Sequence, residues 1–221
     1  MRDRRNDIEH FVLSQGTQVV ARSIPTARVA AIYGAVQGGL LHETMETNGI
    51  SALIASTVDR GTARRTDDQV AKEVAFLQAD LEGIAGRNFQ GLRMEMVQRH
   101  FDPALDLFLD VLLGPLFAGK VLKQECNVLM RDLETQKDYF ETKASNLFLE
   151  TLYPSHPYGM NLLGSLASLR QIGSTEVRKH YRAMVTPDRL VIGIVGAIAQ
   201  DELRERLESL ISKVPKQCTA L

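Results

Sequence analysis

Two short segments carry histidine and glutamate at spacings close to those of zinc-binding helices. Residues 6–10 read Asn-Asp-Ile-Glu-His, and residues 42–46 read His-Glu-Thr-Met-Glu. A zinc site on one helix needs two histidines one turn apart, so that both imidazoles share a face, with a glutamate nearby as general base. Each segment has only one histidine, and neither lies in a helix-like pattern. We therefore expect surface residues of no special role in both.

Other conventional catalytic patterns are also missing. His100, His156 and His180 are isolated from one another in the sequence, and we expect His156 to pack or cap within its own Pro-Tyr-Gly loop. The sequence has no Gly-x-Ser-x-Gly elbow for a nucleophilic serine. The glycine-rich residues 83–88 lack the Lys-Ser/Thr of a phosphate-binding loop and are followed by a strand pattern.

The most informative segment is residues 48–62, which contain a Gly-Ile-Ser opening, an apolar stretch and a Gly-Thr exit. This segment resembles the zinc helix of the M16 metallopeptidases, the family of pitrilysin, insulysin, the mitochondrial processing peptidase and the respiratory core proteins. In that family the helix carries His-x-x-Glu-His. The same positions here hold Ala52, Ala55 and Ser56. The resemblance thus implies a degenerate member that lacks both histidines and the catalytic base.

The resemblance extends to the helix that carries the third zinc ligand of the family, a glutamate preceded by another acidic residue two turns earlier. Residues 125–132 have this character, with Glu125 at the earlier position and Asp132 at the ligand position. One shortened carboxylate cannot supply the three protein ligands of a catalytic zinc. We therefore expect no catalytic residues and no metal in this chain, and zinc only in a catalytic partner.

Two further motifs agree with the family in order and spacing. Residues 105–117 end in Gly-Pro-Leu-Phe after an apolar helix, and residues 152–159 contain Tyr-x-x-His-Pro-Tyr-Gly. The similarity runs from a strand pair near Phe11 to the strand at residues 190–195, so that it covers most of the chain. It implies an M16-like domain of the LuxS-like metallohydrolase fold.

Composition agrees with one ordinary globular unit. The chain has 221 residues, of which 44% are hydrophobic and 24% charged, and its net charge is −1. Basic and acidic residues are mixed, which argues against a nucleic-acid partner. No run approaches the ~20 apolar residues that cross a bilayer, and the start lacks the apolar core of a signal peptide. We expect a soluble chain with no direct membrane insertion, in a compartment that the sequence does not indicate.

The periodicity of apolar residues predicts the elements in order. Expected strands cover residues 9–13, 17–24, 28–37, 81–85, 89–97 and 190–195, and expected helices cover residues 49–60, 66–79, 102–113, 119–138, 142–153, 174–185 and 199–212. Hairpin strands, then helices, then a late return strand predict an α+β fold, a mixed and mostly antiparallel sheet with helices covering one face. We expect a single domain over residues 1–221, with an ordered core of about 9–212 and a tail at 213–221, within a longer or multi-chain assembly.

Three functions fit the resemblance. The first is the metal-free half of a tandem or heteromeric zinc peptidase, which forms chamber wall and partner interface beside an M16-type catalytic domain or subunit. The second is a structural assembly subunit like the respiratory core proteins. The third, an active zinc endopeptidase with unrecognised ligands, is the least favoured.

A peptide-binding role needs no metal. In active relatives a strand beside the zinc helix pairs with extended substrate, and main-chain hydrogen bonds supply the affinity. The resemblance places this role on Gly86, Arg87, Asn88 and Phe89, although these side chains depart from the usual pattern of the family. The alternative is that the segment belongs to an ordinary internal strand pair.

Overall fold

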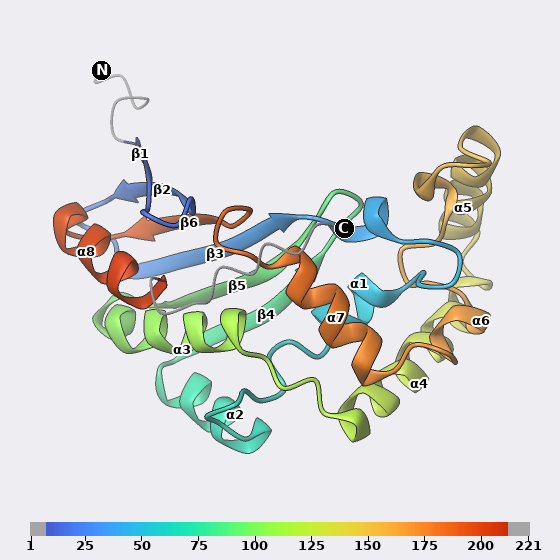
Figure 1. Cartoon of the computed structure of the whole chain (residues 1–221), viewed down its shortest axis with the longest axis horizontal. Helices are drawn as coiled ribbons and strands as arrows, with labels where there is room; N and C mark the ends of the chain where they lie inside the picture. Colours follow the sequence, from blue (N-terminus) through green and yellow to red (C-terminus); the bar gives the residue numbers. More distant parts are fainter. Residues whose placement is uncertain (1–7, 212–221) are drawn as a thin grey trace.

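The computed structural model describes residues 8–211, so that Asn6 and the tail at 213–221 lie outside the described residues. Its centre is a six-stranded sheet in the order β1-β2-β6-β3-β5-β4 (Figure 1). Only β2 and β6 pair in parallel, and the other neighbouring strands are antiparallel. The strands are β1 (Ile8–Val12), β2 (Gln18–Ser23), β3 (Val29–Gln37), β4 (Ala79–Ala85), β5 (Phe89–Val97) and β6 (Val191–Gly196).

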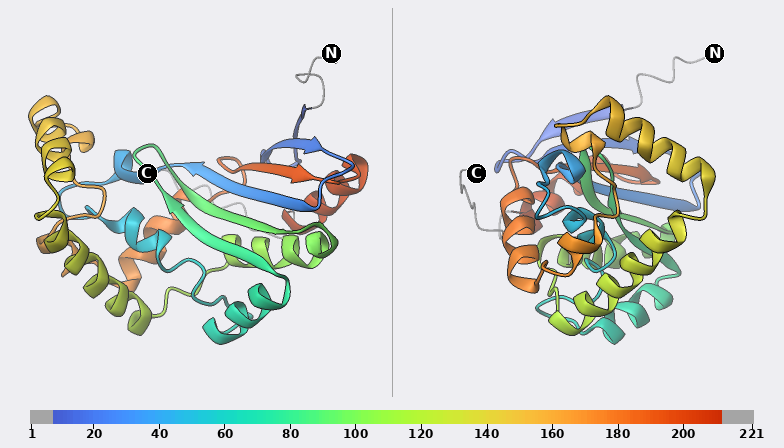
Figure 2. Two further views of the ribbon diagram at one scale, coloured as in Figure 1. Left: turned by 180° about the vertical axis from the view of Figure 1, so that it is seen from behind. Right: turned by 90° about the vertical axis from the view of Figure 1, so that its right-hand side faces the viewer.

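Helices gather on one face of this sheet and around the end of β4, as the views in Figure 2 show. The α+β class and the mixed, mostly antiparallel sheet are as predicted. The helices are α1 (Ile50–Ala55), α2 (Asp67–Phe76), α3 (Phe101–Leu113), α4 (Gly119–Gln136), α5 (Phe140–Leu152), α6 (Leu166–Leu169), α7 (Ser174–Met184) and α8 (Gln200–Ile211).

The two faces of the sheet differ because side chains alternate along each strand. In β3, Ile32 and Val36 point into the core, whereas Tyr33 on the opposite face is exposed. Gly34, between Ile32 and Val36 on the same face, lets α3 approach closely. A β-carbon at residue 34 would lie 2.6 Å from Leu112 and 3.1 Å from Phe108. The core therefore lies between the sheet and α3, and the other face is left open.

The helix expected over residues 49–60 is shorter than predicted, because α1 ends at Ala55. The hydroxyl of Ser56 donates to the carbonyl oxygen of Leu53 at 3.1 Å, and the hydroxyl of Thr57 donates to the same oxygen at 2.5 Å. Such side-chain bonds compete with the helical ladder. The chain then continues in turns to Gly61, whose φ of 98° is left-handed.

Candidate functional site

The backbone of α1 keeps the geometry that a two-histidine motif requires. The N–H of Ser56 donates to the carbonyl oxygen of Ala52 at 3.0 Å, which places these residues one helical turn apart on the same face. The side chains of Ala52, Ala55 and Ser56 are half-buried and line a groove. The motif's frame is therefore present, and its chemical groups are absent.

The groove measures about 1150 Å³ and runs along α1 and β4. Its walls come from α1, all but the first two residues of β4, and parts of β3, β5 and α4. Besides the three motif positions, its lining includes Tyr33, Glu43, Ser51, Asp59, Arg60, residues 81–86, Phe89, Arg93 and Leu129. Segments distant in the sequence thus share one concave surface.

The residues at this place do not fit a zinc ion. The side chains of Ala52 and Ala55 are methyl groups that cannot bind a metal. The Ser56 hydroxyl already donates to a main-chain carbonyl. Asp132 on α4 is exposed and does not line the groove, where Leu129 lies instead. Within residues 8–211, no three His, Cys, Asp or Glu side chains are grouped as a metal site would require. No catalytic step through a metal follows from this arrangement.

The free edge of the sheet borders the groove, because β4 is the last strand in the order. At the turn into β5, the N–H of Gly86 donates to the carbonyl oxygen of Phe89 at 2.8 Å. Antiparallel strands alternate between residues that bond the neighbour and residues that face away. The unbroken register from this turn directs the N–H and C=O of Leu81, Gly83 and Ala85 toward the open edge.

Asp59 brings an unusual carboxyl group to the same groove. Burial raises its pKa from 3.8 to about 6, and the neighbouring carboxylates of Asp67 and Glu125 add to the rise. A main-chain hydrogen bond of Asp59 and the positive charge of Arg60 lower this pKa in part. The Arg60 guanidinium lies 3.1 Å from Asp67 and 4.0 Å from Glu125. Glu125, the earlier acidic position of the resemblance, therefore belongs to this charge cluster. Sequence analysis missed Asp59, although it follows Ala52, Ala55 and Ser56 at helical spacing.

The four expected peptide-binding residues divide into two pairs. Gly86 and Phe89 line the groove. Arg87 donates to the carbonyl oxygen of Tyr158 at 2.9 Å, and the Tyr158 hydroxyl donates to the side-chain oxygen of Asn88. This second pair ties the tip of the β4–β5 hairpin to the Tyr-x-x-His-Pro-Tyr-Gly loop. The free edge itself belongs to β4, the strand that precedes these residues.

That loop is ordered by its own side chains. His156 accepts a hydrogen bond from the N–H of Tyr158 at 3.2 Å, and the two rings pack at 4.6 Å between centroids. The expectation that His156 packs and caps within the loop is therefore confirmed.

Glu43 was expected to be a surface residue of no special role, like the rest of residues 42–46. This expectation is wrong, because Glu43 is buried. Its carboxylate accepts hydrogen bonds from the Asn48 side chain at 3.0 Å and from the N–H groups of Gly49 at 2.7 Å and Ser51 at 3.0 Å. Helix N-termini carry unpaired N–H groups and a partial positive charge that favour such a carboxylate. Glu43 therefore fixes the start of α1 rather than a metal. The Ser51 hydroxyl, buried in the groove wall, has no partner among the described residues.

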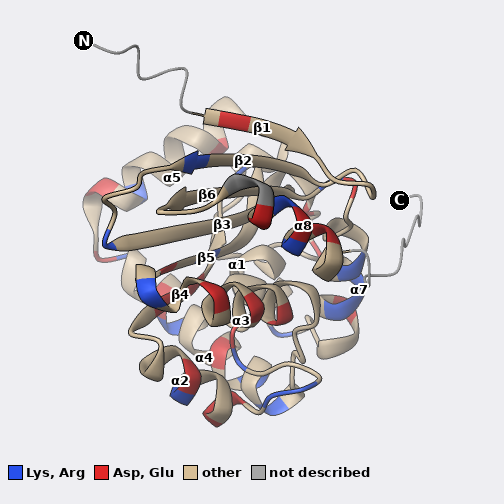
Figure 3. Cartoon of the chain, turned by 90° about the vertical axis from the view of Figure 1, so that its left-hand side faces the viewer, with Lys and Arg blue, Asp and Glu red and all other residues tan. Residues whose placement is uncertain are grey.

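The molecular surface agrees with the mixed charge of the sequence. On the face drawn in Figure 3, α2 and α8 each carry both basic and acidic residues, whereas the charged residues of α3 are all Asp. None of the described helices is both long and apolar enough to cross a lipid bilayer.

Comparisons with known proteins identify one family. Residues 18–165 match the family model described as insulinase, peptidase family M16. The chain is 24% identical over 198 residues to an uncharacterized zinc protease of Bacillus subtilis, covering 90% of this chain and 48% of that protein. It is 24% identical over 203 residues to the mitochondrial-processing peptidase subunit beta of Neurospora crassa, covering 92% of this chain and 43% of that one.

Solved structures show the same fold. A peptidase M16 inactive domain from Pseudomonas fluorescens superposes with a TM-score of 0.89 at 19% identity, covering 97% of this chain and 52% of that one. A protease from Helicobacter pylori gives a TM-score of 0.89 at 16% identity with the same coverage. The chain thus spans about half the length of the proteins that it matches.

Proposed function

The chain belongs to the insulinase family of peptidases, family M16, and from that premise we propose that it is a non-catalytic domain which binds extended peptide beside a catalytic partner. The observation that carries the proposal is the open edge of β4 in the wall of the groove. An exposed strand edge with a cleft beside it is suited to β-augmentation.

Two features support peptide as the ligand. The main-chain groups of Leu81, Gly83 and Ala85 alternate along the edge at the spacing that a second extended chain requires. Phe89, exposed and in the lining, provides an apolar contact. Gly86 and Phe89 would touch the peptide, while Arg87 and Asn88 would hold the hairpin tip in position.

Catalysis is assigned to a partner because the motif positions carry no ligand and no base. Hydrolysis by this family's chemistry needs a metal-bound water, and Ala52, Ala55 and Ser56 cannot hold the ion. A partner is in keeping with the relative named as a subunit of the mitochondrial-processing peptidase. We propose an M16-type catalytic domain or subunit in this role, with zinc only there and with this chain as part of the chamber wall.

The test is a titration of a fluorescent, extended apolar peptide against the chain in the presence of a chelator, read by anisotropy. The proposal expects saturable binding that the chelator does not change. The matched control is the same peptide N-methylated at alternate residues, which cannot pair with a strand edge and should bind at least about tenfold more weakly. Equal binding of both peptides, or binding of neither, would contradict the proposal and favour the alternative of a structural assembly subunit.

A further inference from the structure

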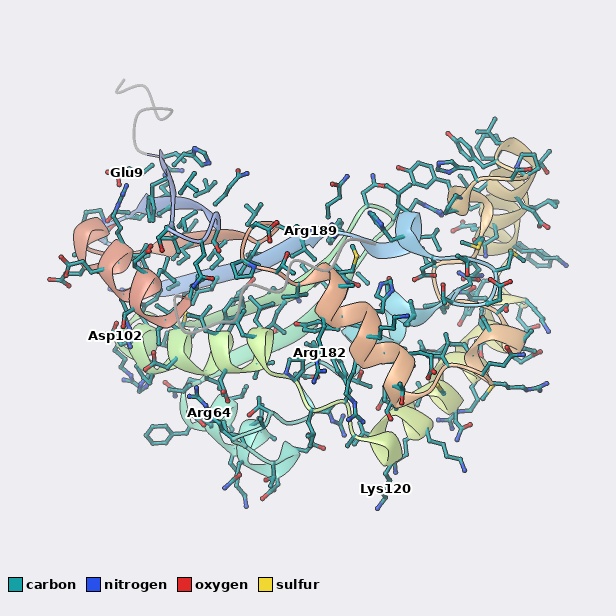
Figure 4. All side chains as sticks on the ribbon, in the orientation of Figure 1. Glu9, Arg64, Asp102, Lys120, Arg182 and Arg189 are labelled. Atoms are coloured by element: carbon teal, nitrogen blue, oxygen red, sulfur yellow. The ribbon has the colours of Figure 1, made fainter. Side chains whose placement is uncertain are left out.

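Helix α5 is little covered by the rest of the described chain. It contains no buried residue over Phe140–Leu152, although the other helices of more than eight residues all do. Figures 1 and 2 show it at one end of the molecule, away from the sheet, and Figure 4 shows its side chains extending outward. Its inner side contacts the short turn η4 (Pro157–Gly159).

The outer side of α5 carries an apolar stripe. Phe140, Ala144, Leu147, Phe148 and Leu152 recur at intervals of three and four residues, which places them on one side of a helix. Phe140 is 87% exposed and Phe148 63%. A helix of this length is marginal in water unless its apolar face is packed, and large exposed patches mark interaction surfaces. The stripe therefore requires an occupant.

We propose that the occupant is a second copy of this chain, with the two α5 helices packed antiparallel across a two-fold axis. A two-fold interface must be complementary to itself. The charges of α5 have this property, because Lys143 and Glu150 lie on the same flank of the stripe, and neither forms an ion pair within the described residues. With the axis crossing the middle of the stripe, at the level of residue 146 along the helix, each Lys143 faces Glu150 of the second copy.

The side-chain sizes follow the same symmetry. In this arrangement Phe140 lies near Leu152 of the second copy, and the small Ala144 lies near the large Phe148. Alternation of large and small residues allows two helices to interdigitate, and antiparallel macrodipoles attract each other. Each favourable contact occurs twice, once for each copy.

The dimer should be weak. Phe140 and Phe148 would each bury on the order of 150 Å², so that the stripe alone stays below the ~800 Å² per partner of a standard interface. No residue of α5 lines the groove along β4, and the proposal is therefore independent of peptide binding.

Sedimentation velocity on the full 221-residue chain over a wide concentration range tests the surface. We expect a concentration-dependent dimer that Phe148→Glu abolishes. Phe76→Glu is the matched control, because Phe76 on α2 is also exposed but lies outside the stripe. Neither variant removes a buried side chain, and equal thermal midpoints would verify the fold. A chain that stays monomeric, or a dimer that survives Phe148→Glu, overturns the proposal.

Charge exchange tests the antiparallel orientation. Lys143→Glu and Glu150→Lys each place like charges in contact twice, and each should weaken the dimer by about tenfold. An equimolar mixture of the two single variants should dimerise again, as should the double variant alone, because opposite charges then meet. The arrangement would be overturned if neither the mixture nor the double variant dimerised. It would also be overturned if the chain were monomeric and bound an M16-type partner through α5.

Discussion

Gly83 in β4 lies so close to Ala55 in α1 that a β-carbon on residue 83 would be 2.1 Å from the carbonyl oxygen of Ala55. Ala55 occupies the position of the glutamate base in the resemblance to active M16 helices. Strand β4 and the degenerate helix α1 are therefore packed against each other through main-chain atoms. This close approach sets the distance between α1 and β4, the two elements along which the groove runs.

Gly83→Ala should destabilise the chain by about 1–3 kcal/mol, because the added methyl group meets main-chain atoms that cannot rotate away. Chemical denaturation measures the change. Gly119→Ala is the control, since a β-carbon there meets nothing within 4 Å and the residue begins α4. The two variants should differ clearly, and similar free energies of unfolding would mean that the close approach is not present in solution.

Restoring the motif tests whether the frame of α1 is intact. The triple variant Ala52→His, Ala55→Glu and Ser56→His places two imidazoles one turn apart, and it should gain affinity for zinc that the parent chain lacks. Elemental mass spectrometry after dialysis gives the stoichiometry. Adding Asp132→Ala to the triple variant should leave the zinc affinity unchanged, because Asp132 is exposed and does not line the groove. A folded triple variant that takes up no zinc would contradict the proposed geometry.

Asp59 should make stability depend on pH. Its pKa is about 6 in the folded chain and ordinarily 3.8, so the folded state holds the proton more tightly. The free energy of unfolding should therefore fall as pH rises from about 4 to about 6 and change no further above that range. Asp59→Asn removes this dependence. The free energy of unfolding of the variant should exceed that of the wild type by at most about 3 kcal/mol at pH 7 and by little at pH 4. Denaturation at several pH values measures the difference, and a difference constant between pH 4 and 8 would contradict the burial of this carboxyl.

Phe89→Ala should lower peptide affinity by about five- to tenfold, because it removes an apolar contact from the lining of the groove. Phe76→Ala is the control, since Phe76 is exposed on α2 and lies outside the groove. Anisotropy titrations give both dissociation constants. Equal losses in the two variants would place the peptide elsewhere.

The fold could largely be predicted from the sequence, because the residues that begin and end most helices and strands lie within a few positions of those elements. Thr66 and Gln69 form the capping box that opens α2, at the start of the helix expected over residues 66–79. The length of α1 was harder to predict, since the hydroxyls of Ser56 and Thr57 end the helix through bonds that a periodic pattern does not reveal. The short α6 was missed for a related reason, because four residues are too few for a periodic signal.

The site was only partly predictable. The motif positions could be located because their frame is contiguous in the sequence, but the role of Glu43 depends on the three-dimensional path of the loop before α1. The exposure of α5 was not foreseen either, because an amphipathic pattern is the same whether its apolar side meets the core or solvent. Strand order, which identifies β4 as the edge, depends on long-range pairing.

The central claim is that the zinc-binding frame survives without its chemistry, and zinc content tests it most directly. The measurement is zinc per chain by elemental mass spectrometry, on protein purified without a chelator and on an Asp132→Ala variant. We expect values near zero for both. A value near one that is lost in Asp132→Ala would contradict the account, because distant ligands would then complete a metal site and the chain would regain the chemistry of a peptidase.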